Sequence, residues 1–286
     1  MNTPVVSPTE LAQQPDESLS ARLGGHIRND LQLVLTPVVL LIVFAAFWTW
    51  LGAQELSGQA ASALRTENLL QQTREQITIT ALSTVGVLLI AIPLGIALTR
   101  PSGKRFAGPA LTIANAGQAI PAYGLLVLAL AVLGRVFGRS RDNILQNTIG
   151  TWLAPGLVIT VIALILFAIL PVLRNTMVGL QQVDEDIIEA GLGMGMTRGE
   201  ILRRIELPLA VPVMLAGVRT ALVINVGMAT LAFLIGGGGL GVAIRTGIQM
   251  SQNVVVLTGG ILTALLALSV DWLGSVAERF LRPKGI

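Results

Sequence analysis

Long apolar runs are the feature of this sequence that most constrains its fold. The hydrocarbon core of a bilayer is about 30 Å thick, so a helix crosses it with about 20 predominantly apolar residues. Six stretches are of that order, and they are Val34–Leu51, Ile77–Leu98, Pro109–Leu133, Leu153–Leu173, Leu209–Ile235 and Val254–Leu273. Because lipid offers the backbone no hydrogen-bond partners, such stretches have to be helical. We therefore predict an all-α integral membrane protein with about six transmembrane helices.

Composition excludes the main soluble classes. Charged residues make up 12% of the 286 residues and hydrophobic residues 53%, whereas a typical soluble domain is about 25% charged. The chain has no cysteine, and its single histidine, His26, lies in a polar segment near the N-terminus. We therefore expect no metal site, no bound cofactor and no enzymatic centre. A net charge of +3 implies no nucleic-acid partner, because basic loops at a membrane surface account for it.

The distribution of Lys and Arg predicts the orientation, because cytoplasmic loops are enriched in both. Residues 1–33 are polar and lack the pattern of a signal peptide, so we predict a cytoplasmic tail followed by a transmembrane domain over 34–286. With the N-terminus inside, the inner segments hold twelve basic residues, namely Arg22, Arg28, Arg100, Lys104, Arg105, Arg174, Arg198, Arg203, Arg204, Arg279, Arg282 and Lys284. The outer segments hold six, namely Arg65, Arg74, Arg135, Arg139, Arg141 and Arg245. Both termini are therefore predicted to be cytoplasmic.

The polar connections differ in pattern. Residues 52–75 suggest a short amphipathic helix outside the bilayer. Residues 174–208 have apolar positions at helical spacing on both sides of Gly191–Gly195, and Pro208 marks the return to the membrane. This pattern predicts a helix, a glycine turn and a second helix on the cytoplasmic side. A compact unit of that kind does not line a pore, and we expect it to dock onto a partner.

At these residues the chain resembles the inner-membrane permeases of binding-protein-dependent ABC importers. That family has a loop of the form E-A-A, three residues, G, nine residues, I, one residue, L-P. The matching residues here are Glu189, Ala190, Gly191, Gly195, Ile205, Leu207 and Pro208. Gly191 is the one departure, since the family pattern has Ala there. The resemblance implies a coupling helix that docks onto an ATPase subunit, which would use ATP and Mg²⁺.

The resemblance extends over about Thr78–Leu273. The sequences IPLGIALTRP, IANAGQAIPAYGLL, ELPLAVPVMLAGVRTA and ATLAFLIGGGGLG look like the osmoprotectant branch, which takes up glycine betaine, carnitine and choline. It implies the type I ABC importer permease fold, with five core helices and a peripheral first helix. It also implies three kinds of partner: ATPase subunits, an extracytoplasmic binding protein and a second permease copy or a paralogue.

Five residues are candidates for the translocation path. Gln118, Pro121 and Tyr123 interrupt the third stretch, and broken helices at membrane depth are tolerated only beside protein or water. Arg219 and Asp271 are charges inside predicted spans, which are costly in lipid. They either pair or share a hydrated vestibule, or each reaches the cytoplasmic interface separately.

Several functional alternatives remain open. The same machine could carry an amino acid such as methionine, because the coupling loop does not encode the cargo. A stand-alone secondary transporter or channel would need intramembrane carboxylates, and Asp271 is the only acidic residue in a predicted span. The chain has no G-x-x-x-x-G-K-[ST] motif for ATP phosphates. Residues 236–241 match G-x-G-x-x-G by letter but follow a membrane span, so we expect either a flexible outer loop or a gating segment.

Overall fold

The computed structural model describes residues 17–138 and 155–281, and within these ranges every regular element is helical. The long helices are α2 (Glu17–Gly52), α4 (Thr66–Thr99), α8 (Pro155–Gln181), α11 (Leu207–Ala229) and α13 (Asn253–Leu281). The shorter ones are α3 (Gly58–Ala63), η1 (Lys104–Phe106), α5 (Ala107–Ala119), α6 (Ala122–Gly138), α9 (Glu185–Gly193), α10 (Arg198–Ile201), η3 (Leu202–Glu206), η4 (Thr230–Ile235) and α12 (Gly241–Gln249). Five helices are long and apolar enough to cross a membrane. The predicted all-α membrane fold is therefore confirmed.

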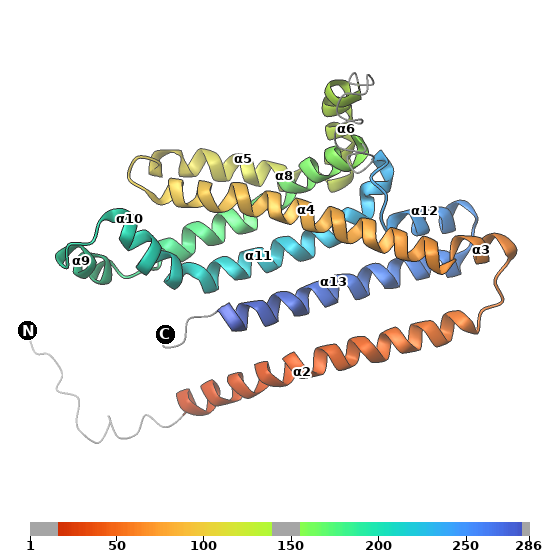
Figure 1. Ribbon diagram of the computed structural model, residues 1–286, viewed down its shortest axis with the longest axis horizontal. Helices are drawn as coiled ribbons and strands as arrows, with labels where there is room; N and C mark the ends of the chain where they lie inside the picture. Colours follow the sequence, from red (N-terminus) through yellow and green to blue (C-terminus); the bar gives the residue numbers. More distant parts are fainter. Residues whose placement is uncertain (1–16, 139–154, 282–286) are drawn as a thin grey trace, which may run out of the picture.

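The third predicted span is not one straight helix. α5 and α6 meet at an angle of 103°, and α6 turns away from the bundle (Figure 1). Pro121 lies at this break, and the preceding Ile120 is extended, with ψ at 129°, as the ring of a following proline favours. The interruption predicted at Gln118–Gly124 is confirmed. The count of six spans holds only if this bent pair is counted as one.

The centre of the bundle is α8, which packs along α4 and α11. Small residues allow the close approach that helix packing in membranes requires. A Cβ added to Gly95 of α4 would lie 2.7 Å from the Thr176 methyl group, and one added to Gly217 of α11 would lie 2.8 Å from the Pro171 carbonyl oxygen. α13 packs on α11, and α2 packs on α13 at the edge of the bundle (Figure 1). The peripheral first helix implied by the resemblance is therefore present.

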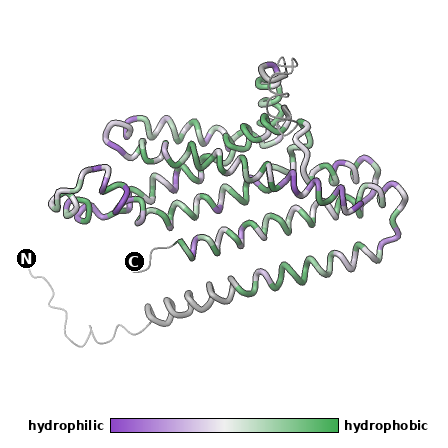
Figure 2. The backbone as a smooth tube through the Cα atoms, viewed as in Figure 1, coloured by the Kyte–Doolittle hydropathy of each residue, from purple (hydrophilic) through white to green (hydrophobic). Residues whose placement is uncertain are grey.

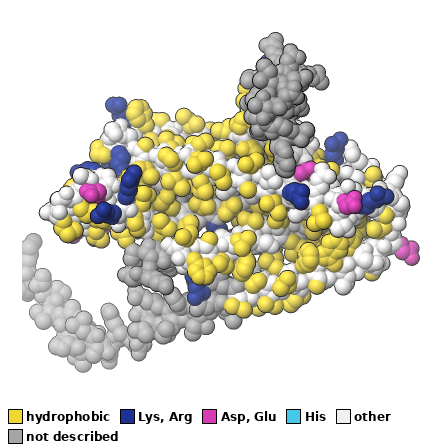
Figure 3. Space-filling model, in the orientation of Figure 1, with side chains coloured by type: hydrophobic (Ala, Val, Ile, Leu, Met, Phe, Trp, Pro, Cys, Tyr) yellow, Lys and Arg dark blue, Asp and Glu magenta, His cyan; other side chains and the backbone are white. Residues whose placement is uncertain are grey.

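Polar residues gather at the two ends of the bundle, and apolar residues lie between them (Figure 2). On the face drawn in Figure 3 a hydrophobic band separates charged groups near α9 and α10 from charged groups near α3 and α12. We call these the α9 end and the α12 end. The beginning of α2 and the last turn of α13 lie at the α9 end (Figure 1).

Two sequence-based boundaries differ from the structure, and a third lies outside the described residues. The second span begins at Thr66, so only the six residues of α3 form the separate short helix expected at 52–75. α2 begins at Glu17, so the segment predicted as a tail is helical from that residue. The predicted start of the fourth span, Leu153, and part of the loop that contains Arg139 and Arg141 lie outside the described residues.

Candidate functional site

The 174–208 segment contains the predicted helix, turn and helix. α9 begins after Asp184, whose side chain accepts a hydrogen bond from the Asp186 amide at 3.0 Å. α9 ends at Gly193, and Gly195 follows with a φ of +84°, a left-handed conformation that glycine adopts without steric cost. The predicted turn therefore lies at 194–196, slightly later than Gly191–Gly195.

The second helix starts with a reciprocal cap. The Thr197 hydroxyl accepts from the Glu200 amide at 3.3 Å, and the Glu200 carboxylate accepts from the Thr197 amide at 2.9 Å, which satisfies two backbone donors at the helix start. The backbone and hydroxyl hydrogen bonds from Thr197 lower the pKa of Glu200 below its ordinary value. The cap fixes where α10 begins relative to the turn.

α10 continues into α11 without a break. Residues 198–235 form one helical stretch, in which a π-helical turn, η3, connects α10 to α11. Leu207 and Pro208 are the first residues of α11. Because the preceding residues are already helical, Pro208 lacks the amide that would bond to a carbonyl of the turn before it, and the π-helical turn lies just before this proline. α10 and the membrane-spanning α11 are therefore parts of one continuous helix.

α9 presents apolar side chains outside the spans. Ile187 is 45% exposed, Leu192 38% and Met194 75%, and we call these three residues the α9 patch. Glu189 and Ala190 beside them are also exposed. A group of exposed apolar side chains at the polar end of the bundle fits a surface that binds another protein.

Gly191, the departure from the family pattern, is buried. A Cβ at this position would lie 3.1 Å from the Ile205 side chain, which is closer than ordinary van der Waals contact, and 3.4 Å from that of Ile201. The missing methyl group lets α9 approach the second helix closely. This internal contact joins Gly191 and Ile205, two residues that sequence reasoning had placed in one motif.

An ion pair between a half-buried arginine and a buried glutamate lies immediately behind this segment. Arg100, at the end of α4, donates from Nη1 to Glu206 Oε1 at 3.1 Å, and its Nη2 pairs with Glu206 Oε2. The Glu206 side chain is only 8% exposed. Sequence reasoning had treated Arg100 as a topology signal and had not singled out Glu206, because nothing local links residues 106 positions apart.

At the α12 end, α4 holds the glycine loop that follows η4. Gln76 is fully buried. It accepts from the Leu240 amide at 3.1 Å and donates to the Val226 carbonyl at 2.8 Å, and the neighbouring Glu75 accepts from the Gly239 amide at 2.9 Å. The loop is thus tied to α4 by defined contacts, which does not fit the flexible-loop alternative.

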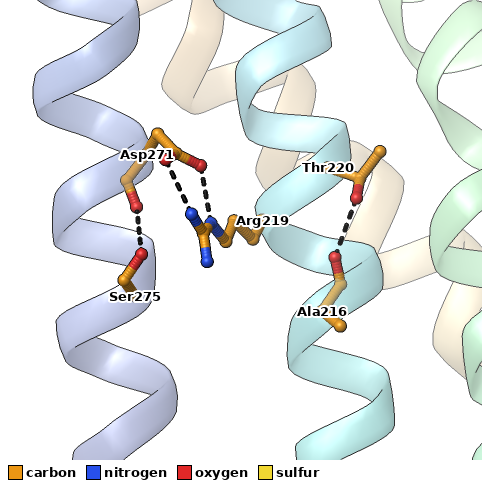
Figure 4. A network of polar contacts seen from close by, with 5 residues as sticks. All are labelled: Ala216, Arg219, Thr220, Asp271 and Ser275. Atoms are coloured by element: carbon orange, nitrogen blue, oxygen red, sulfur yellow. Dashed lines mark hydrogen bonds and ion pairs between the residues drawn. The ribbon is translucent and has the colours of Figure 1, made fainter. Parts of the chain in front are cut away.

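Arg219 of α11 and Asp271 of α13 form a bidentate ion pair (Figure 4). Arg219 Nε lies 2.6 Å from Oδ1 of Asp271, and Nη2 lies 2.7 Å from Oδ2. The Arg219 and Asp271 side chains are 38% and 34% exposed. The predicted pairing is confirmed. The alternative, in which each side chain extends separately to the cytoplasmic interface, does not fit this contact.

The other path candidates lie elsewhere. Gln118 donates to the Phe167 carbonyl of α8 at 3.1 Å. Tyr123, the second residue after Pro121, is 58% exposed on α6. The structure therefore brings Arg219 to Asp271 but does not bring the five candidates together.

Comparison with known proteins agrees with this architecture. Residues 91–283 match the family described as "Binding-protein-dependent transport system inner membrane component". The chain is 38% identical to the choline transport system permease protein OpuBB of Bacillus subtilis, covering 76% of this chain and 90% of that protein. It is 37% identical to the osmoprotectant import permease protein OsmY of Salmonella typhimurium, covering 86% and 93%.

Two solved transporters share the fold. A structure of the inward-facing MetNI methionine ABC transporter matches with a TM-score of 0.60 at 23% identity, covering 75% of this chain and 96% of that chain. A structure of a bacterial alginate ABC transporter matches with a TM-score of 0.54 at 19% identity, covering 91% and 99%. The fold is that of ABC importer permeases, and the chain belongs to the family of binding-protein-dependent transport system inner membrane components.

Proposed function

We propose that this chain is the permease subunit of an ATP-driven importer for osmoprotectants such as glycine betaine, choline or carnitine. The observation that carries the proposal is the similarity to permeases whose names specify choline and osmoprotectant import, at 37–38% identity over most of both chains. The likeness to the methionine transporter is at 23% identity, so it supports the fold and not an amino-acid cargo.

In this proposal the 174–208 segment couples the chain to ATP hydrolysis. Glu189, Ala190 and the α9 patch would dock onto an ATPase subunit, which binds ATP and Mg²⁺ itself, so this chain needs no cofactor of its own. The α9 end would then be cytoplasmic, together with both termini. An extracytoplasmic binding protein would deliver substrate at the α12 end, and two permease copies, or this chain and a paralogue, would enclose the path.

The Arg219–Asp271 ion pair argues against the alternative of a secondary transporter or channel that works without an ATPase. A secondary transporter coupled to ions needs a carboxylate in the membrane that can release its proton or ion. Asp271 is held by two short hydrogen bonds to Arg219, so its charge is already compensated. We propose that the pair borders the path together with Gln118, Pro121 and Tyr123, while the binding protein selects the cargo.

Uptake of labelled glycine betaine tests both the ATP-driven import mechanism and the proposed substrate. Transporter-deficient cells would express this permease with its cognate ATPase and binding protein, with each component omitted in turn. Uptake that requires all three and is competed by choline or carnitine supports the proposal. Saturable uptake of methionine, with no betaine uptake, would support an ATP-driven importer but refute osmoprotectants as its substrates.

Bulky substitutions test the docking role. Glu189→Trp and Gly195→Trp are expected to abolish uptake while the protein still inserts into the membrane. Glu189→Trp is the cleaner variant, because Gly195 has a positive φ that any side chain would strain. Gly108→Trp is a matched control, since Gly108 is exposed on α5 with open space around its Cα. Uptake retained in Glu189→Trp would refute the docking surface.

A further inference from the structure

The Arg100–Glu206 pair lies where two parts of the chain meet. Arg100 caps the C-terminal end of α4, and Glu206 is the last residue of the π-helical turn before α11. The Nε atom of Arg100 is buried without a hydrogen-bond partner, so the two contacts with Glu206 are the ones that compensate this guanidinium in the described residues. Glu206 is buried and Arg100 is half-buried. Removing these charges from water is costly, so the pair contributes little to stability alone.

Three further hydrogen bonds join α4 to the same continuous helix. Near the middle of α4, the Thr84 hydroxyl accepts from the Asn225 amide at 3.0 Å, and both residues are buried. At the α12 end, Gln76 donates to the Val226 carbonyl and to the Thr230 hydroxyl, at 2.8 and 3.1 Å. α4 is therefore fastened to the α10–α11 helix by polar contacts at three levels.

The same end of α4 holds the glycine loop. Gly238 and Gly239 have φ values of +81° and +87°, and a Cβ on either would lie 2.3 or 2.5 Å from a side-chain oxygen of Glu75 or Gln76. The loop can adopt this position only with glycine at both sites. Its placement therefore depends on where the first turns of α4 lie.

We propose that Arg100 and Glu206 are positioning residues that make α4 and the α10–α11 helix move as one lever, which carries displacement of the docked segment to the glycine loop at the opposite membrane face. The inference rests on the docking role proposed above. α11 alone spans about 35 Å at 1.5 Å per residue, which is the thickness of the membrane. Without the ion pair, α10 would still move α11, but the end of α4 that contains Arg100 would no longer be held to the α10–α11 helix and would not follow its movement.

The test uses the complete importer, with permease, ATPase and binding protein, in proteoliposomes. The readout is substrate transported per ATP hydrolysed. Arg100→Gln and Glu206→Gln are expected to lower this ratio about fivefold or more, the lower range of coupling between linked sites, while the ATPase subunit still copurifies. The charge swap, Arg100→Glu with Glu206→Arg, is expected to restore most of the ratio. Arg105→Gln, at an exposed basic residue of η1, is the matched control and should leave the ratio unchanged.

A purely structural role predicts a different result. If Arg100→Gln lowers yield and melting temperature but leaves the ratio unchanged, the lever is refuted. Should either single variant fail to fold, Arg100→Met with Glu206→Leu leaves no unpaired buried charge. That double variant is expected to fold and to show the same loss of ratio, and an unchanged ratio would refute the lever equally.

One more variant separates this inference from the docking proposal. Met194→Asp places a charge in the α9 patch, at a residue that is 75% exposed, and it is expected to release the ATPase subunit. If the subunit stays bound and uptake continues, the docking role is wrong. If Met194→Asp releases the subunit but Arg100→Gln leaves the ratio unchanged, docking stands and the lever is refuted.

Discussion

The Arg219–Asp271 pair allows a quantitative prediction about charge inside the membrane. Arg219→Met retains most of the aliphatic part of the side chain, whose Cγ packs close to Gly274, and Asp271→Asn retains the shape of the carboxylate. Each single variant leaves one charge without its partner. An uncompensated Arg at a helix centre costs about 2.5–3.5 kcal/mol on insertion scales. That value is an upper limit here, because about a third of each side chain is exposed and solvent screening weakens such pairs.

We therefore expect each single variant to lower the free energy of unfolding by about 1–2 kcal/mol. The double variant carries no charge at either position, so it should cost less than the sum of the two by about 1 kcal/mol. The assay is unfolding of the purified permease by SDS in mixed micelles, followed by tryptophan fluorescence. Additivity within about 0.5 kcal/mol would refute the reasoning, because it would mean that the two groups do not interact.

Three further predictions concern the ends of the bundle. Gln76→Leu should lower the free energy of unfolding by about 2–4 kcal/mol in the same SDS assay, because it leaves the buried Leu240 amide and other partners unsatisfied. Gly239→Ala should lower the free energy of unfolding by at least about 1–2 kcal/mol from its positive φ alone. Gly260→Ala, at an exposed position in the first part of α13 with open space for a Cβ, should not lower it measurably. Glu200 has a lowered pKa in the folded protein, so its contribution is present above its ordinary pKa and is lost as the pH falls below about 4.5. Hydrogen-exchange protection of the Thr197 amide, which donates to the Glu200 carboxylate, should fall in that range in the wild type, after correction for the intrinsic rate, but not in Glu200→Gln.

The π-helical turn at Leu202–Glu206 gives the docking segment its geometry. A π-turn inserts an extra residue into a helix and changes which face each later residue presents. Here the turn ends at Glu206, which faces Arg100 of α4, while Ile205 one residue earlier lies near Gly191 of α9. Neighbouring residues of one helix thus contact α9 of the docking segment and the end of α4.

Sequence reasoning predicted the fold class well because lipid imposes local rules. Any apolar run of about 20 residues must be helical in a bilayer, whatever its neighbours are. The helix–turn–helix at 184–206 was equally local, since apolar spacing, a glycine and a cap each act within a few residues. The break at Pro121 was predicted for the same reason, because proline restricts only its own backbone and that of the residue before it.

Local sequence pattern did not predict which side chains pair with each other, with one exception. Arg219 and Asp271 could be paired in advance because Asp271 was the only acidic residue in a predicted span. Arg100 and Glu206 could not be, because both lie in polar segments where many charges offer a partner. Gln76 looked like an ordinary polar residue at the start of an apolar run, and only the packing of α4 against α11 shows that it holds the glycine loop.

The sequence by itself thus determined which segments cross the membrane and which segment has the form of a docking unit. The tertiary structure decided the 103° bend between α5 and α6, the edge position of α2 and the contacts that fasten α4 to α11. The physical reason is that a hydrophobic run gains the same transfer free energy in lipid beside any neighbour, whereas a hydrogen bond or ion pair forms only when packing brings donor and acceptor within about 3 Å.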